Sequence, residues 1–386
     1  MRIYVFRWNA YGIDAVIYNM EEYGHTVFAR GFNAKIGFTD EVIQQIEEDL
    51  RERPIDITFS YNYFPRFAEI SNNFGIPYIS WQYDDMVFRL YHENIYMDTN
   101  YIFCFDYCQY SEHIKRGVNA FYMPLAVDSR IWEAMLLDIT KADRKKYKAD
   151  VSFIGRLYDT DTPDGISMQS EYTQGYLEAT AQVQARMPNG MLLHEILPSH
   201  IVEGLSERSF QDAHDMSWER AIRHWVAHRA TSIERIELIE RLNEKFNFAL
   251  YTQSDLSEMP NIKNRGGAEY YREMPRIFLF SKININLTSR IYQNAIPLRA
   301  LDVLGVGGFL LSDEQQEYYN YFEDGKSIAL FKNMDEMEDK IRFYLSHDKE
   351  RKKIINAGQK IVKSEFDLGR QLEKMINFVK TGYNMK

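Results

Sequence analysis

The feature that most constrains the fold is an alternation of short apolar strands with amphipathic helices in the first third of the chain. Strand-like apolar runs occupy residues 2–6, 55–59, 76–81 and 101–105. Helical patterns lie between or after these runs, at residues 39–50, 66–74 and 109–116. Strands that alternate with short helices predict parallel β-α-β units, and therefore an α/β fold.

The same alternation returns after residue 150. Strands are predicted at residues 150–154, 248–251, 283–287, 308–311 and 328–331, and helices at residues 232–246 and 297–305. The charged segment 140–148 is interpreted as a linker, and residues 157 to about 230 as a helical insertion in the second unit. Because 386 residues exceed one ordinary core, we predict two domains, at 1–149 and 150–365.

Charge and hydropathy narrow the class of protein. The formal net charge of −10 argues against a general nucleic-acid binder, because an acidic protein repels a phosphate backbone. No apolar run is long enough for a transmembrane segment, and the first residues lack a signal-peptide pattern. Cys104 and Cys108 are too few for a disulfide framework and are expected to be reduced thiols. These features together predict a cytoplasmic protein.

The segment from Asn294 to Leu311 has the most specific pattern, which is a loop, a helix, a glycine turn and a strand. Pro297 at the start of the helix leaves free N–H groups, which attract a diphosphate. Arg299 adds a cation one turn in, and Asp302 lies three residues later, where its carboxylate can accept the hydroxyls of a ribose. An ordinary helix with an exposed arginine and aspartate has the same composition.

This segment resembles the C-terminal signature of GT-B glycosyltransferases, especially the group related to the spore maturation protein CgeB. Four further blocks resemble that group in the same order, at residues 76–85, 103–106, 123–128 and 152–156. The resemblance covers most of the chain except the insertion. It implies two Rossmann-like domains facing an interdomain cleft, with a C-terminal helix in 366–386 that can cross back to the first domain. It also implies glycosyl transfer from a nucleoside diphosphate sugar to an acceptor hydroxyl.

The resemblance further assigns roles to individual residues. The implied donor-binding residues are Gly155, Arg156, Tyr251, Lys282, Ile296, Pro297, Leu298, Arg299 and Asp302. Among them, Tyr251 is expected near the base and Asp302 at the ribose. Asp84 or Asp85, after a strand of the first domain, is expected to act as a base or to orient the acceptor. The acceptor itself is left open among a glycan, a protein and a small molecule.

The chain also departs from the wider pattern, and this departure leaves alternatives open. Related retaining enzymes carry a pair of glutamates, whose positions are taken here by Asn294 and Asp302. A non-catalytic nucleotide-sugar-binding protein and a GT-B-fold sugar epimerase therefore remain as alternatives. The Asp159-Thr160-Asp161 triplet resembles a metal-binding motif, but such triplets are common in loops. The His224/His228 pair has no glutamate after His224 and no apparent third ligand. We therefore expect no metal and no cofactor besides the donor substrate.

Overall fold

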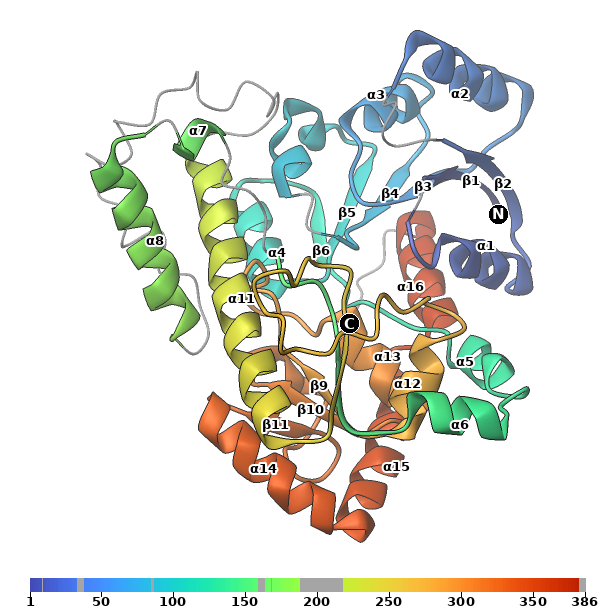
Figure 1. Cartoon of the computed structure of the whole chain (residues 1–386). Helices are drawn as coiled ribbons and strands as arrows, with labels where there is room; N and C mark the ends of the chain where they lie inside the picture. The colour runs from blue at the N-terminus through green and yellow to red at the C-terminus, as the bar shows by residue number, and fades with distance from the viewer. Residues whose placement is uncertain are drawn as a thin grey trace. The chain divides into compact units, whose positions relative to one another are not determined.

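The computed structural model describes residues 1–8, 10–32, 38–84, 87–158, 164–167, 169–187 and 218–381. The chain forms two compact units (Figure 1). Unit 1 contains Met1–Asp128 and the residues from Phe366 on, and unit 2 contains Ser129–Glu365.

Unit 1 is built on a six-stranded parallel sheet with the strand order β2-β1-β3-β4-β5-β6. Its strands are β1 (Arg2–Arg7), β2 (Thr26–Gly31), β3 (Ile57–Tyr61), β4 (Tyr78–Trp81), β5 (Asn100–Cys104) and β6 (Ala120–Tyr122). Its helices are α1 (Ile13–Glu22), α2 (Asp40–Glu52), α3 (Pro65–Asn73), η1 (Val87–Tyr91), η2 (Glu93–Tyr96), α4 (Tyr107–Lys115) and α16 (Leu368–Thr381). The last of these, α16, packs against α1, and its Glu373 contacts His25 through Oε1 and Nε2 at 2.5 Å.

Unit 2 is built on a five-stranded parallel sheet with the order β11-β10-β9-β7-β8. Its strands are β7 (Ala149–Ile154), β8 (Phe248–Tyr251), β9 (Ser281–Asn286), β10 (Leu310–Asp313) and β11 (Ala329–Phe331). Its helices are α5 (Ser129–Met135), α6 (Lys141–Tyr147), α7 (Asp164–Ser167), α8 (Glu171–Ala185), α11 (Trp218–Lys245), α12 (Met274–Phe280), α13 (Leu298–Val306), η4 (Gln316–Asn320), α14 (Met334–Ser346) and α15 (Asp348–Glu365).

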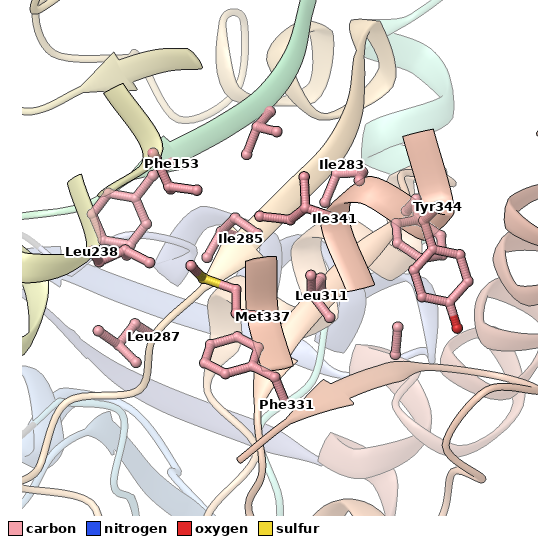
Figure 2. Close-up of a cluster of buried hydrophobic side chains, with 14 of the residues drawn as sticks. Phe153, Leu238, Ile283, Ile285, Leu287, Leu311, Phe331, Met337, Ile341 and Tyr344 are labelled. Carbon is pink, nitrogen blue, oxygen red and sulfur yellow. The ribbon is translucent and has the colours of Figure 1, made fainter. Parts of the chain in front are cut away.

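The hydrophobic core of unit 2 fills the space between this sheet and its helices. Figure 2 shows Phe153 and Ile285 from the sheet packed against Leu238 of α11 and Met337 of α14. All four side chains are at most 3% exposed, so the strands are held from the helix side by a continuous apolar layer. This packing fixes the strand ends that carry the candidate site.

The boundary between the units differs from the predicted one, because the segment 140–148 is not a linker. Thr140 caps α6 in a capping box with Asp143, so the charged run forms a helix. This helix packs against α12 in unit 2, where Arg276 donates to Asp138 at 2.5 Å. The chain therefore enters unit 2 at Ser129 and not after residue 149.

The predicted insertion merges with a helix of the sheet unit. Helix α11 runs for 28 residues, so the helix predicted at 232–246 is the second half of a longer one. Its first half lies alongside α8 (Figure 1), and Leu177 and Ala181 of α8 pack against Ile222 and Val226 of α11. Residues 159–163, including the Asp159-Thr160-Asp161 triplet, lie outside the described residues.

The space around two helical glycines, Gly358 and Gly175, predicts how their alanine variants change stability. A Cβ added at Gly358 of α15 would overlap the Ser327 carbonyl oxygen and approach Leu304 Cδ2 to 2.9 Å. We expect Gly358→Ala to lower the free energy of unfolding by about 1–3 kcal/mol, because backbone cannot move aside cheaply. Gly175 of α8 has nothing within 4 Å of an added Cβ, so Gly175→Ala should stabilise by about 0.5–1 kcal/mol. Urea denaturation checks both, and equal effects in the two variants would contradict the packing.

Candidate functional site

The strand order of unit 2 marks one place on the sheet for a ligand. From β7, the chain adds β8 on one side and β9 on the other, so the order reverses between β7 and β9. In open α/β sheets, ligands bind outside the carboxyl ends of the strands at such a switch point. Here these ends carry Gly155 and Arg156 after β7, and Leu287 to Arg290 after β9.

A buried arginine joins the two strand ends. Arg235 of α11 donates from Nη1 to the Arg156 carbonyl oxygen at 2.5 Å and from Nη2 to the Leu287 carbonyl oxygen at 2.6 Å. Burial lowers the pKa of Arg235, whereas Tyr158, Asp313 and Glu234 raise it, and the positive charge of Arg299 acts in the same direction as burial. Arg299 therefore lies near enough to act on the switch point electrostatically. The side chain of Arg156 is exposed, with no partner among the described residues.

Helix α13 starts one residue later than predicted. Pro297 is the N-cap, with a φ of −68° and a ψ of 147°, and the first helical residue is Leu298. The helix ends at Val306, with Gly307 in the left-handed conformation at a φ of 88°. Proline has no side-chain acceptor, so Pro297 caps none of the N–H groups of the first turn with its side chain, although the Ala300 N–H donates to the Pro297 carbonyl oxygen at 3.0 Å. This helix end can accept an anion, as the sequence suggests.

The contacts of Arg299 are weak for a guanidinium. Its Nη1 donates to the Met274 sulfur at 2.7 Å and lies 3.8 Å from Asp302 Oδ2. The guanidinium also lies 5.6 Å from the Phe278 ring centroid, and the side chain is 26% exposed. A thioether is a poor acceptor, so an anion would be a better partner for Arg299.

Asp302 is more buried than the ribose-binding role requires. Its surface is 1% exposed, and its Oδ1 accepts a hydrogen bond from the Tyr270 hydroxyl at 2.9 Å. Burial raises the pKa of this carboxyl to about 6, although Arg299 and Tyr270 act in the opposite direction. The carboxylate is therefore not open to a ribose in this structure, and its direct contacts are with side chains of unit 2.

Of the other predicted donor-binding residues, Ile296, Leu298 and Tyr251 lie near α13 or the carboxyl end of a strand, whereas Lys282 does not. Ile296 is buried beside Pro297, whereas Leu298 is half-buried at the start of α13. Tyr251 ends β8 but is 5% exposed, and its hydroxyl accepts from Arg265 Nη1 at 3.1 Å. Lys282 does not fit a donor site. It lies near the amino end of β9, away from the switch point, and its Nζ pairs with Asp150 Oδ1 at 2.8 Å.

Gly155 is at the switch point for a different reason from the one predicted. Its N–H donates to the Tyr251 carbonyl oxygen at 3.1 Å, so this amide is not free for a phosphate. An added Cβ would lie 3.1 Å from the Phe153 ring and 3.3 Å from Arg235 Nη1. The glycine therefore leaves room for the buried arginine.

The candidate catalytic aspartates belong to unit 1. Asp84 is exposed just after β4, and its backbone N–H donates to Asn62 Oδ1 at 3.0 Å. Asn62 is fully buried, with a φ of 58°, and its Nδ2 also lies 3.4 Å from Asp84 Oδ2. Asp85 lies outside the described residues, and Trp81 is a core residue with no exposed surface. The strand order of unit 1 reverses between β1 and β3, so Asn62 follows a strand at that switch point.

Sequence reasoning missed three groups beside the unit 2 switch point. Glu234 pairs with Arg290 through Oε2 and Nε at 2.6 Å, and burial raises the pKa of Glu234 to about 7, although Arg290 opposes the shift. Arg235 follows Glu234 directly, and Tyr270 covers Asp302. No sequence signal distinguishes Glu234 and Arg235, because an identical pair, Glu240-Arg241, follows on the same helix.

Asn294, which replaces an acid of the related enzymes, has a structural contact here. Its Oδ1 accepts a hydrogen bond from the Glu317 N–H at 2.8 Å, which links the loop before α13 to η4. In the described ranges, no cluster of three or more histidine, cysteine, aspartate or glutamate side chains has metal-site geometry. No helix in those same ranges combines the length and apolarity that crossing a membrane requires.

Residues 223–377 match the Glycosyl transferase-like family, and this range contains α13 and the switch-point residues after β9. No curated protein matches the sequence of the chain. The chain is 10% identical to the Anabaena protein HepE in complex with UDP-glucose, over 99% of this chain and 100% of that one, with a TM-score of 0.55. It is 10% identical to a glycosyltransferase from Rickettsia africae, over 98% of this chain and 97% of that one, with a TM-score of 0.54. It is 9% identical to sucrose-phosphate synthase from Thermosynechococcus elongatus, over 99% of this chain and 100% of that one, with a TM-score of 0.54.

At these identities the structural similarity shows the fold. The chain has the two-domain, Rossmann-like GT-B fold, so the predicted fold class is confirmed. Residues 223–377 are glycosyl transferase-like in sequence as well.

Proposed function

We propose that the chain transfers a glycosyl group from a nucleoside diphosphate sugar to an acceptor hydroxyl. The observation that carries the proposal is the concentration of cations and uncapped amides at the unit 2 switch point. Arg156 is exposed there, Arg299 has a thioether as its nearest acceptor, and α13 begins without a capping side chain. The family match includes this helix, and the HepE structures contain UDP or UDP-glucose.

These groups would act on the leaving diphosphate. Negative charge grows on the diphosphate as the glycosyl bond breaks, and fixed cations and helix dipoles stabilise that charge. In this proposal Arg156, Arg299 and the Leu298 end of α13 bind the phosphates without a metal ion. The Asp302 carboxylate lies 3.8 Å from the Arg299 guanidinium and holds its charge in place. A direct contact between Asp302 and a ribose would require Tyr270 to move. Retention of configuration and membership of the CgeB-related group remain part of the proposal, on the strength of the resemblance alone.

The test is release of nucleoside diphosphate from a panel of nucleotide sugars, with and without candidate acceptors. We expect release that depends on an acceptor and is unchanged by excess EDTA. Activity abolished by EDTA and restored by manganese would contradict the metal-free mechanism. Donor binding without any release would favour the non-catalytic alternative, for which the amide of Asn294 in place of an acid is the motivating observation.

Asp84 is the proposed base or acceptor-orienting group in unit 1. The Asn62 side chain fixes the backbone at Asp84, so Asp84→Asn changes the charge while this anchor remains. We expect Asp84→Asn to lower turnover by about tenfold to a thousandfold, with little change in donor affinity. Asp14, a surface carboxylate of α1 paired with Arg7, provides a control variant, Asp14→Asn. Full transfer activity in Asp84→Asn would rule out the assignment.

A further inference from the structure

Arg235 is a buried cation without a carboxylate partner among the residues that the structure describes. Its surface is 8% exposed, and its only hydrogen bonds there go to the carbonyl oxygens of Arg156 and Leu287. Its Nε is buried with no acceptor. A buried charge that is satisfied by carbonyl groups alone is unfavourable unless another group compensates it.

The surrounding chain is shaped to hold this guanidinium. It lies 5.5 Å from the Phe153 ring centroid and 4.9 Å from the Tyr158 ring centroid. Tyr158 has a φ of 56°, which is rare for a residue with a bulky side chain. Gly155 leaves the space that a Cβ would take from Nη1. Strained and space-restricted positions that persist together mark functional sites more often than ordinary core.

The nearby carboxylates are already engaged. Glu234 pairs with Arg290, and Asp313 accepts hydrogen bonds from the N–H and Oγ1 of Thr288 at 2.8 Å and from Gln315 Nε2 at 2.8 Å. These donors to Asp313 are neutral, so its carboxylate, together with Glu234, still acts on Arg235 and raises its pKa, against the lowering by burial. The charge of the guanidinium is therefore offset within the fold, and its distinctive feature is the pair of hydrogen bonds that joins the carbonyl oxygens of Arg156 and Leu287.

We propose that Arg235 is a positioning residue that holds the Arg156 loop and the Leu287–Arg290 loop in register for the donor phosphates. One planar guanidinium with two parallel donors can bridge two carbonyl groups, whereas a lysine ammonium offers only a point charge. Arg235 acts through these loops. This inference rests on the proposed function for its ligand, but the bridge between the loops exists without one.

The first experiment needs no ligand and no activity. Hydrogen exchange is measured on peptides covering residues 151–158 and 284–292 in the wild type, Arg235→Met and Arg241→Met. Arg241 lies on the same helix and pairs at the surface with Asp335 at 2.7 Å, so it is the matched control. We expect faster exchange in both peptides for Arg235→Met and in neither for Arg241→Met. Unchanged exchange in Arg235→Met would overturn the bridge.

The second experiment measures donor KM and kcat with the nucleotide sugar that the wild type uses. We expect Arg235→Met to raise the donor KM by about tenfold or more, with kcat within about threefold. Arg235→Lys should fall between the wild type and Arg235→Met. If Arg235→Met fails to fold, Arg235→Lys and Gly155→Ala, which moves Nη1 without changing its charge, take its place. An unchanged KM, or a fall in kcat alone, would contradict the positioning role.

The two experiments separate this inference from the proposed function. A wild type that neither binds nucleoside diphosphates nor transfers sugar would end the proposed function, while the exchange comparison would still decide whether Arg235 joins the loops. If the wild type is active and Arg235→Met changes neither the hydrogen exchange nor the donor KM, the role of Arg235 is contradicted and the proposed function is not.

Discussion

Arg299→Ala is expected to weaken the affinity of the protein for a nucleoside diphosphate by about tenfold or more. A charge-assisted hydrogen bond to phosphate contributes about 1.5–3 kcal/mol, and 1.4 kcal/mol corresponds to a factor of ten in Kd. The fold should tolerate the change, because Arg299 lies at the start of α13, 26% exposed, and its contacts within the described ranges are a hydrogen bond to the Met274 sulfur and a 3.8 Å approach to Asp302. Calorimetric titration with UDP, and then with the other nucleoside diphosphates, measures the effect.

Lys282→Ala is the control for that titration. Lys282 belongs to the same sheet and carries the same charge, but it lies at the amino end of β9 in a half-exposed pair with Asp150. A general electrostatic effect on the nucleotide would weaken binding in both variants to a similar degree. A site at the carboxyl ends of β7 and β9 predicts loss in Arg299→Ala alone. Unchanged affinity in Arg299→Ala would place the phosphates elsewhere.

The sequence was sufficient for the parts of the fold where burial is continuous. Strand β8 was predicted at residues 248–251, as observed, because its apolar run is bounded by polar residues. Strand β2 was missed, since an edge strand shows alternating exposure and a weak apolar pattern. The unit boundary was misplaced for a related reason. The charged segment before β7 looked like a linker, yet Thr140 and Asp143 form a capping box that makes it a helix.

The candidate site was only partly predictable, because its side chains come from distant parts of the chain. Arg156 and Arg299 could be found from local motifs next to strands. Arg235 lies 79 residues beyond Arg156, and Tyr270 lies 32 residues before Asp302. Nothing in the sequence shows that such pairs meet, because the strand order that brings them together is a property of the whole sheet. The burial of Asp302 could not be predicted from the sequence either, because Tyr270, which contacts it, comes from a distant segment.

Asp302→Asn is expected to raise the stability of unit 2 at neutral pH while weakening donor binding. Burial raises the pKa of the Asp302 carboxyl from 3.8 to about 6, so folding favours its protonated form. The stabilisation from this protonation is fully present below about pH 3.8 and is lost as the pH rises through about 6. Above that pH, the buried carboxylate costs the folded state about 3 kcal/mol. Asparagine stays neutral and can still accept the Tyr270 hydrogen bond.

The measurement is therefore a difference between Asp302→Asn and the wild type across pH 4–8, obtained by urea denaturation. The gap in the free energy of unfolding should be small near pH 4 and grow to at most about 3 kcal/mol by pH 7. Asp49 in unit 1 gives the opposite case, because the hydrogen bond from Arg30 holds its pKa below the usual range. Asp49→Asn should destabilise the protein, and increasingly so as the pH rises through the acid range. A gap for Asp302→Asn that is negative at pH 7, or that does not vary with pH, would show that burial does not destabilise the Asp302 carboxylate in the folded state.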